Sequence, residues 1–180
     1  MRDSGEGQRP PASGGAVSRA PSGAADRRRF AEDFLVGELF GLGSHRFEEA
    51  AVVAFARRYD AQPFHLDHDA GAASMLGGLA ASGWQVVAVL NRAFSESVLA
   101  GTHHRGLVAV DRVRWIRPVL AGARLSASAR VDSLEGQDRQ TGAGAAAGIV
   151  RFVVTAWDDA GRNTVEIFRR DRVACFGEAS

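Results

Sequence analysis

Apolar and polar residues alternate through much of the second half of the chain. Residues 125–132 alternate strictly, with Leu125, Ala127, Ala129 and Val131 separated by polar side chains. Weaker versions of the same pattern occupy residues 110–117, 149–157 and 164–173. Successive side chains of a strand point to opposite faces, so this pattern predicts four antiparallel strands, each with one buried face.

Helical spacing of apolar residues appears ahead of these strands. Residues 48–58 and the tyrosine that follows carry Val52, Phe55, Ala56 and Tyr59 at i, i+3, i+4 and i+7. This spacing predicts a short helix with one apolar face, which ends at the following Asp-containing turn. The preceding residues 34–47 mix large apolar side chains with glycines, which indicates an irregular first strand.

A second, longer helix is predicted after a loop of small residues at positions 70–81. Ser82 suits its N-cap position, so the helix should begin at Gly83 or Trp84. We expect it to be mostly buried, with an apolar stripe made by Val87, Asn91, Phe94 and Val98.

A strand, a long buried helix and four antiparallel strands, in this order, predict an α+β protein with two layers. This is the order of a hotdog fold, in which an antiparallel sheet wraps around a central helix. A single sheet of this kind leaves one edge and part of one face uncovered. We therefore expect a homodimer or a higher homo-oligomer.

Residues 1–29 differ from the rest of the chain because they are rich in Gly, Ser, Pro, Ala and Arg and have almost no large apolar side chains. Such a segment cannot bury enough surface to offset the entropy lost on ordering. We expect a disordered tail at 1–29 and one folded domain at 30–180. The tail could instead be a basic arm that docks on a partner, or translation could begin downstream of it.

Composition excludes several functions. The net charge is only +1, so no overall field favours nucleic acid or an anionic membrane. All 22 cationic residues are arginine, which excludes Schiff-base chemistry on lysine. The single Cys175 allows no internal disulfide and no cysteine-based zinc site. A lone cysteine fits a reducing compartment, so we expect a cytoplasmic protein. We expect no membrane segment, because no apolar run approaches the ~18 residues of a membrane span.

The candidate chemistry lies at the end of the first helix, where Asp60 and His65 are five residues apart around Pro63. A carboxylate and an imidazole held together on a stiff turn can share acid–base work. Asp60 could instead be only a turn residue, and His65 a buried histidine. Gln62 could hold a water or His65, or bind backbone, and Asp67 is expected to cap the next turn.

Other histidines offer no metal-binding pattern. His45, His68, His103 and His104 lack carboxylate or cysteine neighbours at a suitable spacing, and two adjacent histidines cannot easily face one ion. We therefore expect neither a metal nor another cofactor.

Three blocks, in the same order, resemble the MaoC-like dehydratases, the group of (R)-specific enoyl-CoA hydratases. Residues 55–67 resemble the family's hydratase-2 motif, residues 76–84 its overhanging segment and helix start, and residues 114–119 the strand after the helix. The resemblance spans roughly residues 34–173. It differs at Gln62, where many relatives have Asn, and at Ser82, where His is common.

This resemblance implies a hotdog fold and reversible hydration of a trans-2-enoyl thioester to an (R)-3-hydroxyacyl thioester. Carried onto this chain, the catalytic pair is Asp60, mainly as the base, and His65, which shares the proton. The Gly83 N–H at the helix start would stabilise the thioester oxyanion, with Ser82, Gln62 and Trp84 also expected at the substrate.

The expected partner is an acyl-CoA or an acyl-carrier-protein thioester. Three arginines, Arg112, Arg114 and Arg117, could meet the phosphates of coenzyme A, although solvated strand arginines explain them as well. Trp84 and Trp115 are most simply core aromatics, though either could line an acyl tunnel. Because the hotdog fold also carries thioesterases and non-catalytic acyl-thioester-binding proteins, both remain alternatives.

Overall fold

The computed structural model describes residues 28–136 and 147–175 as a five-stranded antiparallel sheet with one long helix against it. The strands are β1 (Leu39–Arg46), β2 (His104–Trp115), β3 (Arg124–Glu135), β4 (Ala147–Asp158) and β5 (Asn163–Ala174). The helices are α1 (Glu49–Tyr59), α2 (His68–Ala73) and α3 (Gly83–Ser97), with short 3-10 turns η1 (Ala31–Asp33), η2 (Pro63–His65) and η3 (Leu99–Gly101). The hotdog fold predicted from the sequence is confirmed.

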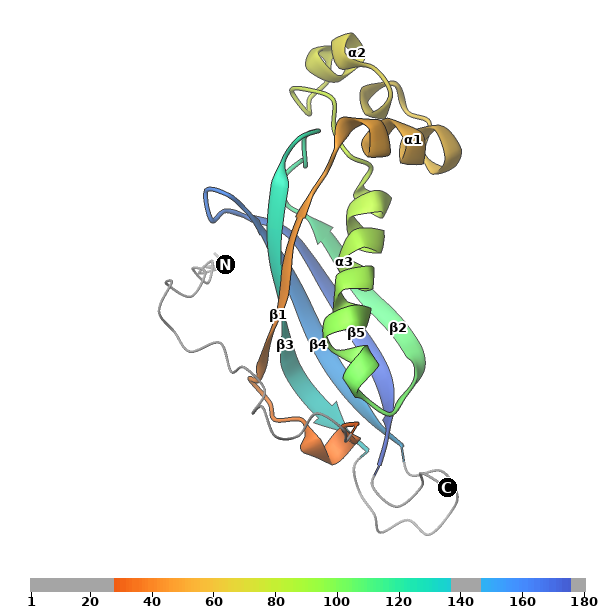
Figure 1. Cartoon of the computed structure of the whole chain (residues 1–180), viewed down its shortest axis with the longest axis vertical. Coiled ribbons are helices and arrows are strands. Elements are labelled where there is room, and N and C mark those ends of the chain that lie inside the picture. Colours follow the sequence, from red (N-terminus) through yellow and green to blue (C-terminus); the bar gives the residue numbers. More distant parts are fainter. Residues whose placement is uncertain (1–27, 137–146, 176–180) are drawn as a thin grey trace, which may run out of the picture.

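The sheet has the strand order β1-β3-β4-β5-β2, so β1 and β2 form its two edges. Figure 1 shows α3 lying lengthwise across one face, with α1 and α2 beyond the end where α3 begins. The pairings among these five strands are antiparallel, as the alternating segments predict. The expected irregularity of the first strand is also found, because the pairing of β1 with β3 shifts between Gly41 and Ser44.

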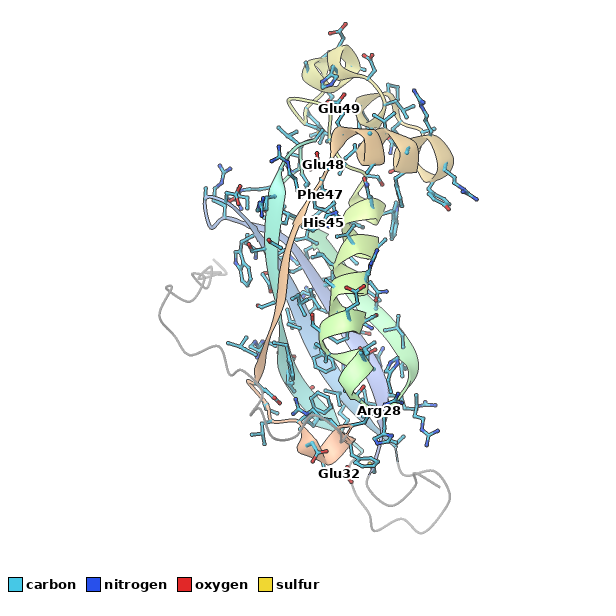
Figure 2. The ribbon with its side chains drawn as sticks, viewed as in Figure 1. Arg28, Glu32, His45, Phe47, Glu48 and Glu49 are labelled. Carbon is cyan, nitrogen blue, oxygen red and sulfur yellow. The ribbon has the colours of Figure 1, made fainter. Side chains whose placement is uncertain are left out.

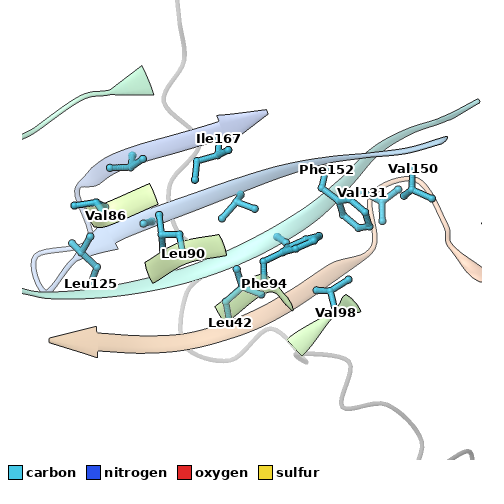
Figure 3. Packing of buried hydrophobic residues seen from close by; sticks show 14 of the residues in the cluster. Leu42, Val86, Leu90, Phe94, Val98, Leu125, Val131, Val150, Phe152 and Ile167 are labelled. Carbon is cyan, nitrogen blue, oxygen red and sulfur yellow. The ribbon is translucent and has the colours of Figure 1, made fainter. Parts of the chain in front are cut away.

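The core lies between α3 and the sheet. Val86, Leu90 and Phe94 of α3 are buried against it (Figure 3), and the Phe94 ring meets Phe152 of β4 edge-on at a centroid distance of 4.9 Å. The predicted stripe is correct for Phe94 and Val98 but wrong for Asn91, which is exposed. The buried face of α3 therefore runs through Val86 and Leu90, one position before the predicted Val87 and Asn91.

The joint between β1 and α1 positions the candidate site. Figure 2 shows His45, Phe47, Glu48 and Glu49 following one another from the strand into the helix. Phe47 is buried, and its ring meets the His45 ring edge-on at 5.1 Å, which anchors the joint. The start of α1 is thus held against the core.

The predicted α1 is confirmed, and Val52 and Ala56 form its buried side. Tyr59 is exposed, so its predicted place on the buried face is wrong. The small-residue segment expected to be a loop contains most of α2, and Asp67 caps this helix as predicted. Its Oδ1 accepts the Ala70 N–H at 2.9 Å.

The folded part includes the last residue of the predicted tail. The Arg29 guanidinium pairs with Glu38 at 2.7 Å, and its backbone N–H donates to the Gly101 carbonyl at 2.9 Å. Residues 1–27 of the predicted tail lie outside the described part, as do residues 137–146 and 176–180. Among the described residues, no helix has the length and apolar character needed to cross a membrane.

The β2 edge carries exposed apolar side chains. Leu107, Val108 and Val110 are each more than two-fifths exposed, and within the described residues β2 pairs only with β5. An unpaired strand edge with apolar side chains is a surface that proteins usually cover.

Candidate active site

The turn after α1 brings Asp60 and His65 together. Asp60 ends the helix, where its N–H still donates to the Ala56 carbonyl at 2.9 Å. Pro63 is the first residue of η2, a position that suits proline because its φ is fixed near the helical value. His65 is the last residue of this turn. As a result, His65 Nε2 lies 3.5 Å from Asp60 Oδ2.

The imidazole of His65 has a defined orientation. The side chain is buried, with 6% of the residue exposed, and its Nδ1 lies 2.7 Å from the Ala80 carbonyl oxygen. A carbonyl only accepts hydrogen bonds, so Nδ1 must carry the proton. In the neutral ring, Nε2 is then a proton acceptor that faces the carboxylate.

The carboxylate of Asp60 is held at both oxygens. The Ser82 hydroxyl donates to Oδ2 at 2.7 Å, and the Gln62 side-chain amide donates to Oδ1 at 3.0 Å. These two bonds, Ser82 first and Gln62 second, lower the pKa of Asp60 below its ordinary value of 3.8, and nearby His65 contributes less. Burial acts in the opposite direction but is outweighed, so Asp60 is an anion at neutral pH.

The sequence left open whether Gln62 binds a water, His65 or backbone, and the structure shows a different partner. Its amide holds Asp60 rather than backbone or His65. With the ring in its neutral form, Asp60 Oδ2 and His65 Nε2 are two acceptors that face each other across 3.5 Å. This arrangement suits a molecule that donates two hydrogen atoms, such as a water, which is the reactant that hydration needs.

Ser82 and Gly83 form the start of α3, as predicted. Ser82 is fully buried and caps the helix, because its Oγ accepts the Trp84 N–H at 3.2 Å. Gly83 is the first helical residue, so its N–H has no acceptor within the helix. Among the described residues, none accepts a hydrogen bond from this N–H.

Two tryptophans lie beside this helix start. Trp84 is 60% exposed and Trp115 46% exposed, so their interpretation as core aromatics is wrong. Their rings meet edge-on with centroids 5.4 Å apart, and the Trp115 Nε1–H donates to the Gly83 carbonyl at 3.1 Å. Both rings lie next to the Gly83 backbone.

The three arginines of the β2 region are engaged within the protein. Arg114 pairs with Glu166 at 3.0 Å, and Arg117 donates to the Asn163 carbonyl. Arg112 lies over the Phe168 ring, 4.4 Å from its centroid. These contacts favour structural roles over phosphate binding.

A cavity of about 380 Å³ lies away from the candidate site, among strands β2 to β5. Asp111 and Arg151 are among its lining residues and pair with each other at 3.3 Å. Arg151 also pairs with Glu135 at 2.6 Å. We assign the chemistry to the Asp60 turn, because the charges at the cavity largely neutralise each other.

Two features of the site escaped the sequence analysis. One is the Ala80 carbonyl, which selects the tautomer of His65, and a backbone acceptor leaves no mark in a sequence. The other is the bond from Ser82 to Asp60. The N-cap signal located Ser82 on the helix but did not indicate that its hydroxyl reaches the turn after α1.

Comparison with known proteins finds a matching family model and similar solved structures. The family model described as "MaoC like domain" matches residues 35–151, which include both the Asp60 turn and the start of α3. A MaoC-like dehydratase from Rhodospirillum rubrum is 31% identical, with a TM-score of 0.69, and the match covers 82% of this chain and 97% of that one.

More distant solved structures share the fold. The R-hydratase PhaJ1 of Pseudomonas aeruginosa is 21% identical with a TM-score of 0.62, over 81% of this chain and 85% of that one. The HadBC 3R-hydroxyacyl-ACP dehydratase complex of Mycobacterium tuberculosis is 19% identical with a TM-score of 0.59, over 77% and 97%. Among curated proteins, none matches the chain in sequence.

Proposed function

The chain belongs to the MaoC-like domain family, and from this membership we propose that it reversibly hydrates a 2-enoyl thioester to an (R)-3-hydroxyacyl thioester. The family and the neighbouring structures support a hydratase or dehydratase in general. The finer assignment of reaction and residues rests on the geometry around Asp60 and His65.

In the hydration direction, a water held by Asp60 Oδ2 and His65 Nε2 attacks C3 of the enoyl group. One O–H bond of this water breaks as the C3–O bond forms, and Asp60 acts mainly as the base that takes the proton. This proton, which His65 Nε2 shares, is then delivered to C2. The π electrons move toward the thioester oxygen as the C3–O bond forms, and return to form the C2–H bond. The roles reverse for dehydration, and each acid–base group contributes ~10²–10⁴-fold in rate.

Negative charge develops on the thioester oxygen during this addition. The Gly83 N–H at the start of the 15-residue helix α3 is the donor that we assign to it. The unpaired amides and the dipole at a helix N-terminus favour such a charge. The carboxylate and the oxyanion donor stay close together because Ser82 contacts Asp60.

The observation that supports this proposal most directly is the convergence of Oδ2 and Nε2, with the histidine tautomer set by Ala80. The test is the loss of enoyl-thioester absorbance with crotonyl-CoA. We expect folded Asp60→Asn and His65→Gln proteins to lose ~10²–10⁴-fold in rate. Asp67→Asn, on the same segment, is the control and should keep parental activity. Parental rates in both site variants would refute the assignment.

The same assay separates hydration from thioester hydrolysis. Hydration consumes the enoyl chromophore and releases no thiol, whereas a thioesterase releases one. We expect no thiol release, because a water held by both Asp60 and His65 suits addition at C3. Parallel assays with coenzyme A and acyl-carrier-protein thioesters identify the carrier.

A second copy of the chain is the partner that we propose for the β2 edge. Pairing of two β2 strands would continue the sheet and cover Leu107, Val108 and Val110, which are exposed in the single chain. The neighbouring HadBC structure is described as a complex. Light scattering on the purified protein measures its mass and so distinguishes a monomer from a dimer.

A further inference from the structure

We propose that Ser82 is a positioning residue, whose hydroxyl links the general base Asp60 to the first turn of α3. This role rests on the proposed function and goes beyond it, because it makes one side chain responsible for the relative placement of the base and the oxyanion donor. Ser82 itself touches no reacting atom in this scheme.

The direction of the hydrogen bonds requires this link. A serine oxygen can accept bonds but has only one proton to donate. Its oxygen accepts the Trp84 N–H at 3.2 Å, and its proton goes to Asp60 Oδ2 at 2.7 Å. The bonds therefore run in one direction, from the amide of the helix through the hydroxyl to the carboxylate, and such chains strengthen each bond.

Burial makes the link rigid. Ser82 has no exposed surface, so water cannot replace either bond in place. Oδ2 is also the oxygen that faces His65 Nε2. A carboxylate oxygen has two lone-pair positions, so the bond from Ser82 leaves one for the reacting water. Gln62 holds the other oxygen, which fixes the rotation of the carboxylate.

A simple helix cap predicts different behaviour. If Ser82 only caps α3, its removal costs stability but leaves the titration of Asp60 unchanged. If it positions the base, its removal raises the pKa of Asp60, because this bond is the largest cause of the lowered value. The more basic carboxylate would react faster if it stayed in place. A fall in kcat therefore reports lost position rather than lost basicity.

The experiment compares the full-length parent with Ser82→Ala, Ser82→Thr and Thr102→Val. Thr102 is the matched control, since it is buried beyond the far end of α3 and its hydroxyl bonds only locally, to the Leu99 carbonyl at 2.9 Å. Asp60 is titrated by carbon-13 NMR of labelled aspartate carboxyls, and its signal is assigned with Asp60→Asn. The pH profiles of kcat and kcat/KM are recorded with crotonyl-CoA.

We expect Ser82→Ala to raise the midpoint of Asp60 and to lower kcat at neutral pH by up to about 10²-fold, the loss typical of a misplaced catalytic group. Ser82→Thr should restore both, and Thr102→Val should change neither. An unchanged Asp60 midpoint in folded Ser82→Ala overturns the proposal, whatever the activity. If the parent hydrates no enoyl thioester but the midpoint shifts, the positioning holds and the proposed function fails.

Discussion

The close contact of Gly83 with Trp115 allows a sharp test of why glycine stands at the start of α3. A Cβ on Gly83 would lie 2.6 Å from Trp115 Nε1, 2.9 Å from Cε2 and 3.0 Å from Cδ1. These atoms belong to a rigid ring, so Gly83→Ala forces the whole indole to move. The displaced ring loses its bond to the Gly83 carbonyl and its edge-on contact with Trp84.

The loss of stability in Gly83→Ala follows from the loss of these two contacts. The hydrogen bond contributes about 0.5–1.5 kcal/mol, and the aromatic pair a similar amount. Trp115 is partly exposed and can swing toward solvent, so overpacking of the interior adds little. Alanine offsets part of the loss, because it is the better helix former by up to about 1 kcal/mol. We therefore expect Gly83→Ala to lower the free energy of unfolding by about 1–2 kcal/mol.

A double-mutant cycle measured by urea denaturation checks this reasoning. In a Trp115→Ala background the obstacle is gone, so Gly83→Ala should be neutral or stabilising by up to about 1 kcal/mol, which gives a coupling energy of about 1–3 kcal/mol. Gly78→Ala is the control, because its Cβ would meet only Leu120 at 3.5 Å, an ordinary contact. Equal costs of Gly83→Ala in both backgrounds would refute the explanation. Activity of the double variant shows whether substrate tolerates a methyl group at this position.

Three further predictions concern charge and assembly. The pKa of Asp60 is lowered in the folded protein, so its stabilising effect is present above the unfolded pKa and lost as pH falls through the folded one. In urea denaturation, the unfolding free energy of the parent relative to that of Asp60→Asn should therefore fall as the pH drops below the unfolded pKa, and a difference that stays constant or rises there would contradict the lowered pKa. Asp171→Asn should lower the free energy of unfolding, measured by urea denaturation, by about 3–5 kcal/mol, because it leaves the buried Arg169 charge uncompensated. Asp132→Asn, which breaks an exposed pair with Arg130, should lower it by less than about 1 kcal/mol. Val110→Lys on the β2 edge should shift the mass in light scattering toward the monomer, and an unchanged oligomer would place the interface elsewhere.

Local chemistry made the fold and half of the site predictable. The alternation in β3 follows directly from strand geometry, and the start of α3 from the N-cap chemistry of Ser82. Asp60 and His65 lie within one short turn, so their side chains could be placed near each other without knowledge of distant contacts. Each of these features depends on neighbours in sequence.

The remaining features depend on residues far apart in the chain. Ser82 reaches Asp60 across 22 positions, and Trp115 reaches Gly83 across 32. Whether Trp84 is buried depends on which face of α3 turns to the sheet, and two stripes one residue apart satisfy the same helical period. Periodicity alone cannot choose between these stripes.

The misplaced Asn91 shows why hydrophobic pattern failed at this point of α3. Arg169 and Asp171 lie on the inner face of β5, where alternation predicts apolar residues, and they are 4% and 0% exposed. A guanidinium can be buried there because Asp171 pairs with two of its nitrogens, at 2.7 and 2.8 Å, while the Phe94 ring lies 4.0 Å away. The third nitrogen, Nη1, donates to Asn91 Oδ1 at 2.8 Å, a partner 78 positions earlier. Asn91 therefore lies beside the buried stripe because it completes the hydrogen bonding of a buried charge, a requirement that only the folded chain creates.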